Sequence, residues 1–350
     1  MALPGYALPL LGAPDGRRAD LIPPPRRVRI AVDAAGADTG PAAAVDGALA
    51  ALDEVDLLLV GPEDMVRERL GDRPPAEVSV LHAPETIGMA EDPVLATRTK
   101  RRSSMLLAAR AVAGGAADAM VSPGNAGAVV LAAATQLRRL PGVQHPALAT
   151  LLPVPGGGAV VLLDAGAAPA ASPDWLAQYA VLGAGYARAR LGLAEPRIGL
   201  LANGHEDGKG APVHQQAHEL LAGLPGATGR YLGRIEAYDL LGGRVDVAVT
   251  DGFTGDVVLK MHERTLEASA AVVAAAAPGA PHAVDALWTA LAPEAGAVLL
   301  GVRGVCVKCH GAAPAHDIEE SVRLAAACVR AEVTRRVAEG FSPPGPGSGR

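Results

Sequence analysis

Aromatic side chains are scarce in this sequence, and their scarcity argues against one class of function. The 350 residues include 2 Trp, 5 Tyr and 2 Phe, although half of the chain is apolar. A surface that binds nucleic acid by stacking needs aromatic side chains and positive charge, and the net charge here is −6. The apolar fraction allows a sizeable buried core. The composition therefore predicts a folded protein without a nucleic-acid partner.

Cysteines and long apolar runs are also few. Three cysteines cannot form a disulfide framework, which favours a reducing compartment. No stretch of about 18 uninterrupted apolar residues occurs, because Pro278 and Pro281 follow the alanine-rich run 266–277. The N-terminus lacks the basic-then-apolar order of a secretory signal. We therefore expect a cytoplasmic protein without a membrane-spanning helix.

Lysine and asparagine are rare enough to attract attention where they occur. The 31 basic residues include four lysines, and the chain has two asparagines, at Lys100, Lys209, Lys260, Lys308, Asn125 and Asn203. A compact ammonium and a guanidinium fork are not interchangeable. All six lie close to the loop motifs described below, so we expect some of them to be retained for chemistry; chance is the alternative.

Short runs of Val, Ile, Leu and Ala alternate with longer stretches at helical spacing, which predicts βα units around a mainly parallel sheet. The expected strands are 28–32, 57–60, 78–81, 119–121, 147–152, 159–163, 198–201, 245–250 and 305–307. Helices are expected to begin near Ser104, Ala126, Asp174, Thr254 and Ile318. Glycine-containing loops follow five strands, and we expect them to gather in one crevice at the strands' carboxyl ends. The segments 1–26 and 341–350 are predicted to be disordered.

Two strand-to-helix turns have the composition of anion sites. The first, Ser122-Pro-Gly124-Asn125-Ala-Gly127-Ala, can present backbone N–H groups and a helix N-terminus to phosphate, although it matches neither common nucleotide-binding pattern and also suits a plain tight turn. The second runs from Asp251 to Lys260. There Thr254 is the expected N-cap, and Lys260 would lean toward the helix start unless it is a solvated surface lysine.

Two further segments contain charged or reactive groups. A basic cluster at 98–104, in which Ser103 or Ser104 can cap a helix, suits an acidic partner or a phosphate, or is a solvated face. The segment Cys306-Val-Lys308-Cys-His310 has the spacing of a haem attachment site, but without an export signal we interpret it as a strand at the edge of the sheet, with Cys306 buried. Three carboxylates could serve in acid/base catalysis or bind a metal, namely Asp164, Asp207 and Glu206. Their spacing does not require either role, and the sequence contains no zinc-binding pattern.

Seven loop motifs, in their order, resemble the phosphate acyltransferase (PlsX) family of bacterial phospholipid synthesis. The resemblance extends from about residue 27 to 337 and rests on VDAAGAD (32–38), SSM (103–105), SPGNAGA (122–128), LDAGA (163–167), KG (209–210), DGFTG (251–255) and KCHGA (308–312). It implies a domain over 27–340 with the three-layer α/β/α fold shared by isocitrate and isopropylmalate dehydrogenases and phosphotransacetylases. It also implies a reaction in which acyl-[acyl-carrier-protein] and inorganic phosphate give acyl phosphate, which then acylates glycerol 3-phosphate through a downstream acyltransferase.

The chemistry of that reaction suggests roles for the residues in these motifs. The site needs an anion cradle, an oxyanion stabiliser and a proton donor for the leaving thiolate. Lys260 or Lys308 can neutralise phosphate, and His310 is the obvious acid, so we assign Lys260, His310 and Asn125 to catalysis. Phosphate or substrate binding is assigned to Ser122, Gly124, Gly127, Asp164, Lys209, Asp251, Thr254, Gly255 and Lys308. Carrier-protein docking is assigned to Arg98, Lys100, Arg101 and Arg102, and no metal or cofactor is expected.

The sequence departs from the family pattern at several loop positions. These are Ala37, His145, Ala168, Ala202 and Asp256, and the family's long helical hairpin is shortened here to a segment at about 274–295. Three alternatives therefore stay open: a paralogue that binds without turnover, a phosphotransacetylase-like enzyme using acyl-coenzyme A and, less favoured, a nicotinamide dehydrogenase. We expect a homodimer that associates through a sheet edge or helix faces and binds lipid weakly.

Overall fold

The computed structural model describes residues 27–38, 40–71 and 74–341. Its centre is one eleven-stranded sheet, and the order of the strands across it is β3 (Val78–His82), β2 (Val55–Gly61), β1 (Val28–Asp33), β4 (Ala119–Ser122), β11 (Val305–Cys309), β10 (Gly296–Leu300), β5 (Ala147–Pro153), β6 (Ala159–Leu163), β9 (Val247–Val249), β7 (Arg197–Leu201) and β8 (Arg230–Ile235). The segments 1–26 and 342–350, predicted to be disordered, lie outside the described residues, whereas Phe341 bonds through its N–H to the Ala338 carbonyl.

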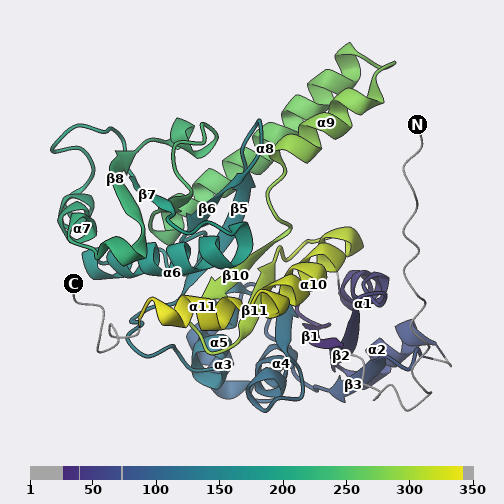
Figure 1. Cartoon of the computed structure of the whole chain (residues 1–350). Helices are drawn as coiled ribbons and strands as arrows, with labels where there is room; N and C mark the ends of the chain where they lie inside the picture. Colours follow the sequence, from purple (N-terminus) through teal and green to yellow (C-terminus); the bar gives the residue numbers. More distant parts are fainter. Residues whose placement is uncertain (1–26, 39, 72–73, 342–350) are drawn as a thin grey trace, which may run out of the picture.

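Helices cover both faces of the sheet (Figure 1). One face packs against α1 (Pro41–Ala50), α2 (Glu63–Leu70), α6 (Pro173–Leu191), α7 (Pro212–Ala222), α10 (Ala315–Arg330) and α11 (Val333–Glu339). The other packs against α3 (Pro93–Thr99), α4 (Ser104–Ala113), α5 (Ala126–Gln136), α8 (Gly252–Ala276) and the short helix η2 (Ala237–Leu240). Each face of the sheet has its own hydrophobic core, and successive strand residues point into them alternately. In β1, Ile30 and Val32 pack into the core on the first face and Ala31 packs into the core on the other. The predicted α/β fold with helices on both faces is confirmed.

The direction of the strands reverses in the middle of the sheet. Strands β3, β2, β1, β4 and β11 are parallel, but the pairs β11/β10, β10/β5 and β5/β6 are all antiparallel. Strands β6, β9, β7 and β8 are again parallel to one another. Three successive reversals leave the second group pointing opposite to the first. The loops after β1, β4 and β11 therefore lie at one end of the strands, and the loops after β6, β9 and β7 lie at the other. The prediction that five glycine-containing loops gather in one crevice is wrong.

Two strands and one strand position differ from the expectations. Strand β8 has the sequence RYLGRI, whose two arginines and glycine hide its apolar alternation, and β10 falls where the helical insertion was expected to end. Strand β11 lies between β4 and β10, so the prediction of an edge strand at Cys306 is wrong, although Cys306 is fully buried as expected. Its two neighbouring strands supply the backbone partners that an edge strand would lack.

The shortened insertion is a hairpin of two helices and not one short segment. Helix α8 continues to Ala276, and α9 (Pro281–Leu291) folds back beside it, so that the pair extends beyond the body of the molecule (Figure 1). Pro281 stands in the first turn of α9, where its missing N–H costs no hydrogen bond. Within the described residues, no helix combines the length and the apolar character needed to cross a bilayer.

Candidate functional site

A buried hydroxyl ties the end of β1 to the loop after β4. The Ser122 hydroxyl donates to Asp33 Oδ2 at 2.7 Å and accepts from the Gly124 N–H at 3.1 Å. Both side chains are fully buried. The loop after β1 passes so close that a Cβ on Gly36 would lie 2.5 Å from Asp33 Oδ2. Asp33 thus holds the SPGN loop (residues 122–125) in place. The sequence did not suggest this role for Asp33.

The carboxyl group of Asp33 is electrostatically unusual. Burial raises its pKa, and the hydrogen bond from the Ser122 hydroxyl, together with the nearby hydroxyl of Ser104, opposes this rise. Burial thus disfavours the charged form of this carboxyl, and the hydrogen bond from Ser122 offsets part of that cost.

Asn125 shapes the start of α5. It is the N-cap of this helix, and its Oδ1 accepts the Ala128 N–H at 3.1 Å. Its Nδ2 donates to the carbonyl of Met89 at 2.8 Å, which holds the segment before α3 against the SPGN loop. The first turn of α5 thus keeps free backbone N–H groups and the positive end of its dipole at the carboxyl end of β4.

Lys308 and His310 lie at the same end of the strands. Lys308 is half-buried next to the end of β11; burial lowers its pKa, and the ionisable groups of Cys309, Asp38 and Asp33 oppose that shift. Its ammonium group donates to the Cys309 carbonyl. The exposed His310 follows, with Nδ1 3.3 Å from the Ala312 N–H. The structure therefore brings together three predicted motifs: VDAAGAD, SPGNAGA and KCHGA.

Asp164 has a structural task at the opposite end of the strands. Its side chain is fully buried, and burial raises its pKa. Backbone N–H groups compensate: Leu148, Gly166 and Ala167 donate to Oδ1 at 2.8–3.1 Å, and Ala168 donates to Oδ2 at 2.8 Å. The carboxylate is thereby occupied in ordering its own loop. We infer that any effect of Asp164 on substrate binding is indirect.

Helix α8 begins directly on the Asp164 loop. Its N-cap is Asp251, whose Oδ1 accepts the Thr254 N–H at 2.9 Å, so the expectation that Thr254 caps the helix is wrong. The Thr254 hydroxyl instead donates to Asp251 Oδ2. A Cβ on Gly255 would overlap the carbonyl oxygen of Asp164, so only glycine permits this approach. Asp251, Thr254 and Gly255 therefore hold the helix start against the sheet.

From that start, α8 reaches toward the first group of loops. Asp256 lies beside Gly166, and its carboxylate pairs with the Lys260 ammonium at 2.6 Å. One turn further on, burial raises the pKa of Glu263, and the charge of His310 opposes that rise. Asp256, Lys260 and Glu263 are spaced three and four residues apart and so share one side of the helix. Glu263 was missed in the sequence; its helical spacing from Lys260 was the available signal.

The remaining predicted residues are placed apart from this group. Lys209 is exposed in the loop after β7, at the opposite end of the strands from Lys308. Asp207 is also exposed and pairs with Arg234 at 3.5 Å, so it does not combine with the buried Asp164. Among the described residues, no three His, Cys, Asp or Glu side chains are arranged to hold a metal ion.

The four basic residues assigned to carrier docking have different surroundings in the structure. Lys100 pairs with Glu91 at 2.6 Å and donates to the Thr86 carbonyl, so its charge is already partnered. Arg98 and Arg101 line a groove with Arg110, whereas Arg102 does not line it.

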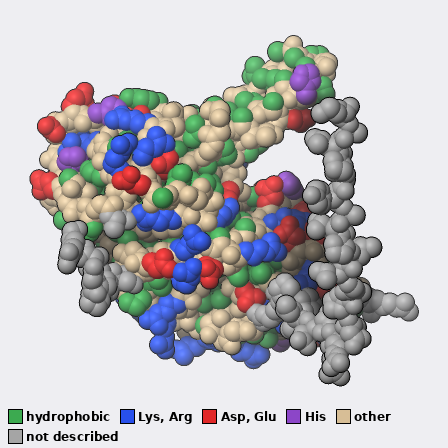
Figure 2. All heavy atoms as spheres, viewed as in Figure 1, with side chains coloured by type: hydrophobic (Ala, Val, Ile, Leu, Met, Phe, Trp, Pro, Cys, Tyr) green, Lys and Arg blue, Asp and Glu red, His purple; other side chains and the backbone are tan. Residues whose placement is uncertain are grey.

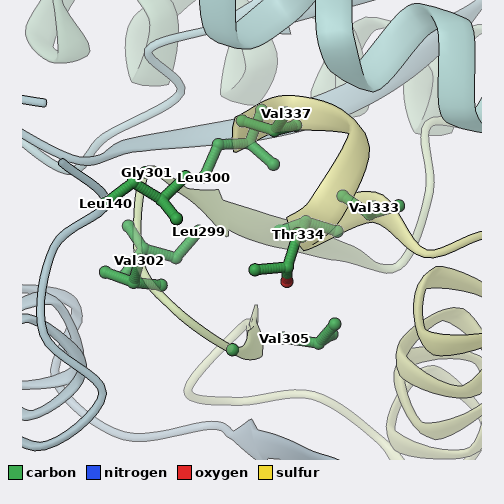
Figure 3. Close-up of a pocket in the computed structure, with 11 residues that line it drawn as sticks. Leu140, Leu299, Leu300, Gly301, Val302, Val305, Val333, Thr334 and Val337 are labelled. Atoms are coloured by element: carbon green, nitrogen blue, oxygen red, sulfur yellow. The ribbon is translucent and has the colours of Figure 1, made fainter. Parts of the chain in front are cut away.

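A cavity in the core is too small and too far away to serve this site. It has a volume of about 10 Å³, which is room for about one water molecule, and Figure 3 shows its apolar lining around Val302 and Val305. Val305 begins β11, so the cavity lies at the opposite end of that strand from Lys308.

Comparison with known proteins gives consistent similarities. Residues 28–336 match the family described as fatty acid synthesis protein. The chain is 39% identical to a phosphate acyltransferase of Myxococcus xanthus, over 88% of this chain and 93% of that one, and 36% identical to one of Lacticaseibacillus casei, over 90% and 96%. A phosphotransacetylase from Streptococcus pyogenes has a similar fold, with a TM-score of 0.63 at 16% identity over 87% of this chain and 94% of that chain.

Replacing Ser122 by Ala tests the link between Asp33 and the SPGN loop. We expect the variant to lose about 1–2 kcal/mol of stability and to need more phosphate, because the loop loses its fixed position. Ser79→Ala is a matched control, since the Ser79 hydroxyl donates to the Leu57 carbonyl at 3.1 Å on distant β3. Urea unfolding and phosphate titrations measure the two effects. An unchanged KM for phosphate in Ser122→Ala would show that the Ser122–Asp33 hydrogen bond contributes to stability and not to phosphate binding.

Proposed function

Because the chain belongs to the phosphate acyltransferase family, we propose that it transfers the acyl group of acyl-[acyl-carrier-protein] to inorganic phosphate. Family membership confirms the predicted class of enzyme, a phosphate acyltransferase of fatty acid and phospholipid synthesis. The observation that best supports a site for this reaction is the joining of three motifs at one end of the strands. There, the α5 N-terminus, Lys308 and His310 adjoin the loop fixed by Asp33 and Ser122.

The proposed reaction needs one bond exchange and one proton transfer. A phosphate oxygen attacks the thioester carbonyl carbon, the carbon–sulfur bond breaks and the carrier leaves as a thiolate. The backbone N–H groups at the start of α5 and the ammonium of Lys308 stabilise the phosphate charge. His310 donates a proton to the thiolate, so that the carrier is released as a free thiol. The acyl phosphate then serves as donor to a downstream glycerol-3-phosphate acyltransferase.

The activity is tested by incubating the protein with acyl-carrier-protein, with and without phosphate. Hydroxylamine trapping detects acyl phosphate, and a thiol reagent detects the free carrier. We expect both products to form only when phosphate is present. Thiol release that is independent of phosphate would indicate hydrolysis, and no release would favour a binding paralogue. Acyl-coenzyme A as sole effective donor would favour the phosphotransacetylase-like alternative.

In the same assay, His310→Ala should lower kcat by about 10²-fold, because general acid catalysis typically contributes at least that much. The alkaline limb of the pH–rate profile should disappear, since it reports loss of the His310 proton. His316→Ala is the matched control, because His316 is exposed on α10 and pairs with Glu320. A variant that keeps the normal pH–rate profile would remove His310 from the mechanism.

Lys260 is proposed to assist phosphate binding, with Asp256 competing for its charge. The family pattern has asparagine at position 256, so the ion pair at 2.6 Å results from this chain's own departure. Lys260→Met should raise the KM for phosphate, and Asp256→Asn should lower it, because the ammonium is then unpaired. Phosphate titrations of both variants measure these shifts. If both substitutions leave the KM unchanged, Lys260 is a solvated surface residue.

We propose that two copies associate through the exposed side of α8. Phe253, Val257, Met261 and Val272 are 51–67% exposed, and they follow one another at helical spacing. The homodimer expected from the sequence associates through a sheet edge or helix faces, and this side of α8 is such a face. Val257→Asp with Met261→Asp should convert a dimer to a monomer in sedimentation equilibrium, whereas Leu220→Asp on α7, at a position 41% exposed, should not. A wild-type monomer would contradict the proposal.

A further inference from the structure

A basic groove lies between α3, α4 and α5. Its volume is about 380 Å³, and its apolar lining includes Leu106 and Leu131. Three guanidinium groups surround it, from Arg98 and Arg101 around the end of α3 and from Arg110 on α4. Figure 2 shows Lys and Arg side chains gathered where Figure 1 places α3 and α4. A positively charged rim over an apolar floor is the composition of a protein docking site.

The charges of this groove are not used within the fold. In the described part of the chain, no carboxylate lies within 4.0 Å of the guanidinium groups of Arg98, Arg101 and Arg110. Arg110 donates to the Gln136 side chain, and Arg101 approaches the Arg98 carbonyl at 3.4 Å. By contrast, Arg67 and Arg69 on α2 each have a carboxylate partner. The groove therefore offers three positive charges to an external partner.

The groove leads to the candidate site. Val94 lines it, and the preceding residue, Pro93, lies against Gly127 in the SPGNAGA motif. Thr135 and Gln136 line it at the far end of α5, whose eleven residues span about 16 Å at 1.5 Å each. A partner held at Arg110 is thus about one helix length from Asn125. A flexible arm that carries the acyl thioester can span this distance.

We propose that this groove docks the acidic helical surface of the acyl carrier protein, with the carrier's prosthetic arm running along α5 toward Asn125. The proposal rests on the proposed acyl-carrier-protein donor. It refines the docking set, because Arg110 joins Arg98 and Arg101, whereas Lys100 is committed to Glu91 and Arg102 lies outside the groove. Oppositely charged surfaces accelerate encounter and fix orientation, and salt weakens the attraction.

The test is charge reversal of the three arginines together, as Arg98→Glu, Arg101→Glu and Arg110→Glu. We expect the KM for acyl-carrier-protein to rise at least about tenfold, with kcat changed by less than about twofold, because the charges act on encounter and orientation. The KM for phosphate should not change. Arg67→Glu, an exposed arginine on α2, is the matched control and should behave as wild type. Added salt should raise the wild-type KM more steeply than that of the triple variant.

Three results would overturn the docking proposal. The first is an unchanged KM for acyl-carrier-protein in a folded triple variant while the wild type remains active. The second is an equal rise in KM for acyl-coenzyme A, which would mean that the groove binds the arm common to both donors. If the triple variant does not fold, Arg98→Gln, Arg101→Gln and Arg110→Gln are made as single variants, and their affinity for the carrier is measured. The third overturning result is an unchanged affinity in all three single variants. An inactive wild type would instead contradict the proposed function.

Discussion

The reversal of strand direction at β10 and β5 determines where every functional loop of this molecule lies. Parallel strands place their carboxyl-end loops together, so a uniformly parallel sheet would have collected all the glycine-containing turns in one crevice. Three antiparallel pairs divide them into two groups at opposite ends of the strands. Helix α8 begins in one group and reaches the neighbourhood of His310 in the other. The side chains along α8 therefore connect the two groups of loops.

Close backbone approach explains why so many of the motifs contain glycine. Gly36 admits the Asp33 carboxylate, and Gly255 allows α8 to rest on the Asp164 loop. In both places a side chain would displace the backbone that fixes a helix N-terminus. Asp33 and Asp164 also share a physical role, since each is a buried carboxyl group whose hydrogen bonds fix a loop. Much of the motif sequence thus builds the supports of the site, and fewer residues remain to contact substrate.

Most of the strands and the starts of five helices could be predicted from the sequence, because these depend on local patterns. The expected strand 159–163 coincides with β6, and helices begin at Ser104 and Ala126 as expected. Strand direction could not be predicted in the same way, because it depends on which distant segments pair. The mistaken N-cap has a comparable cause. Asp251 and Thr254 are both favourable caps, and the end of β9 at Val249, together with the packing of Gly252 and Gly255, selects the first.

The four lysines of this lysine-poor chain have different surroundings in the structure. Lys100 and Lys260 form ion pairs, Lys308 is half-buried near two carboxyl groups and Lys209 is exposed in a glycine-rich loop. Lys308 is half-buried, burial lowers its pKa, and its ammonium donates to the Cys309 carbonyl, which suits a compact ammonium better than a guanidinium fork. The arginines of the basic groove have the opposite requirement, since an exposed, permanently charged guanidinium retains its charge in solvent. At these two places the choice of cation therefore suits the surroundings: a compact ammonium at the half-buried position 308, and guanidinium groups around the exposed groove.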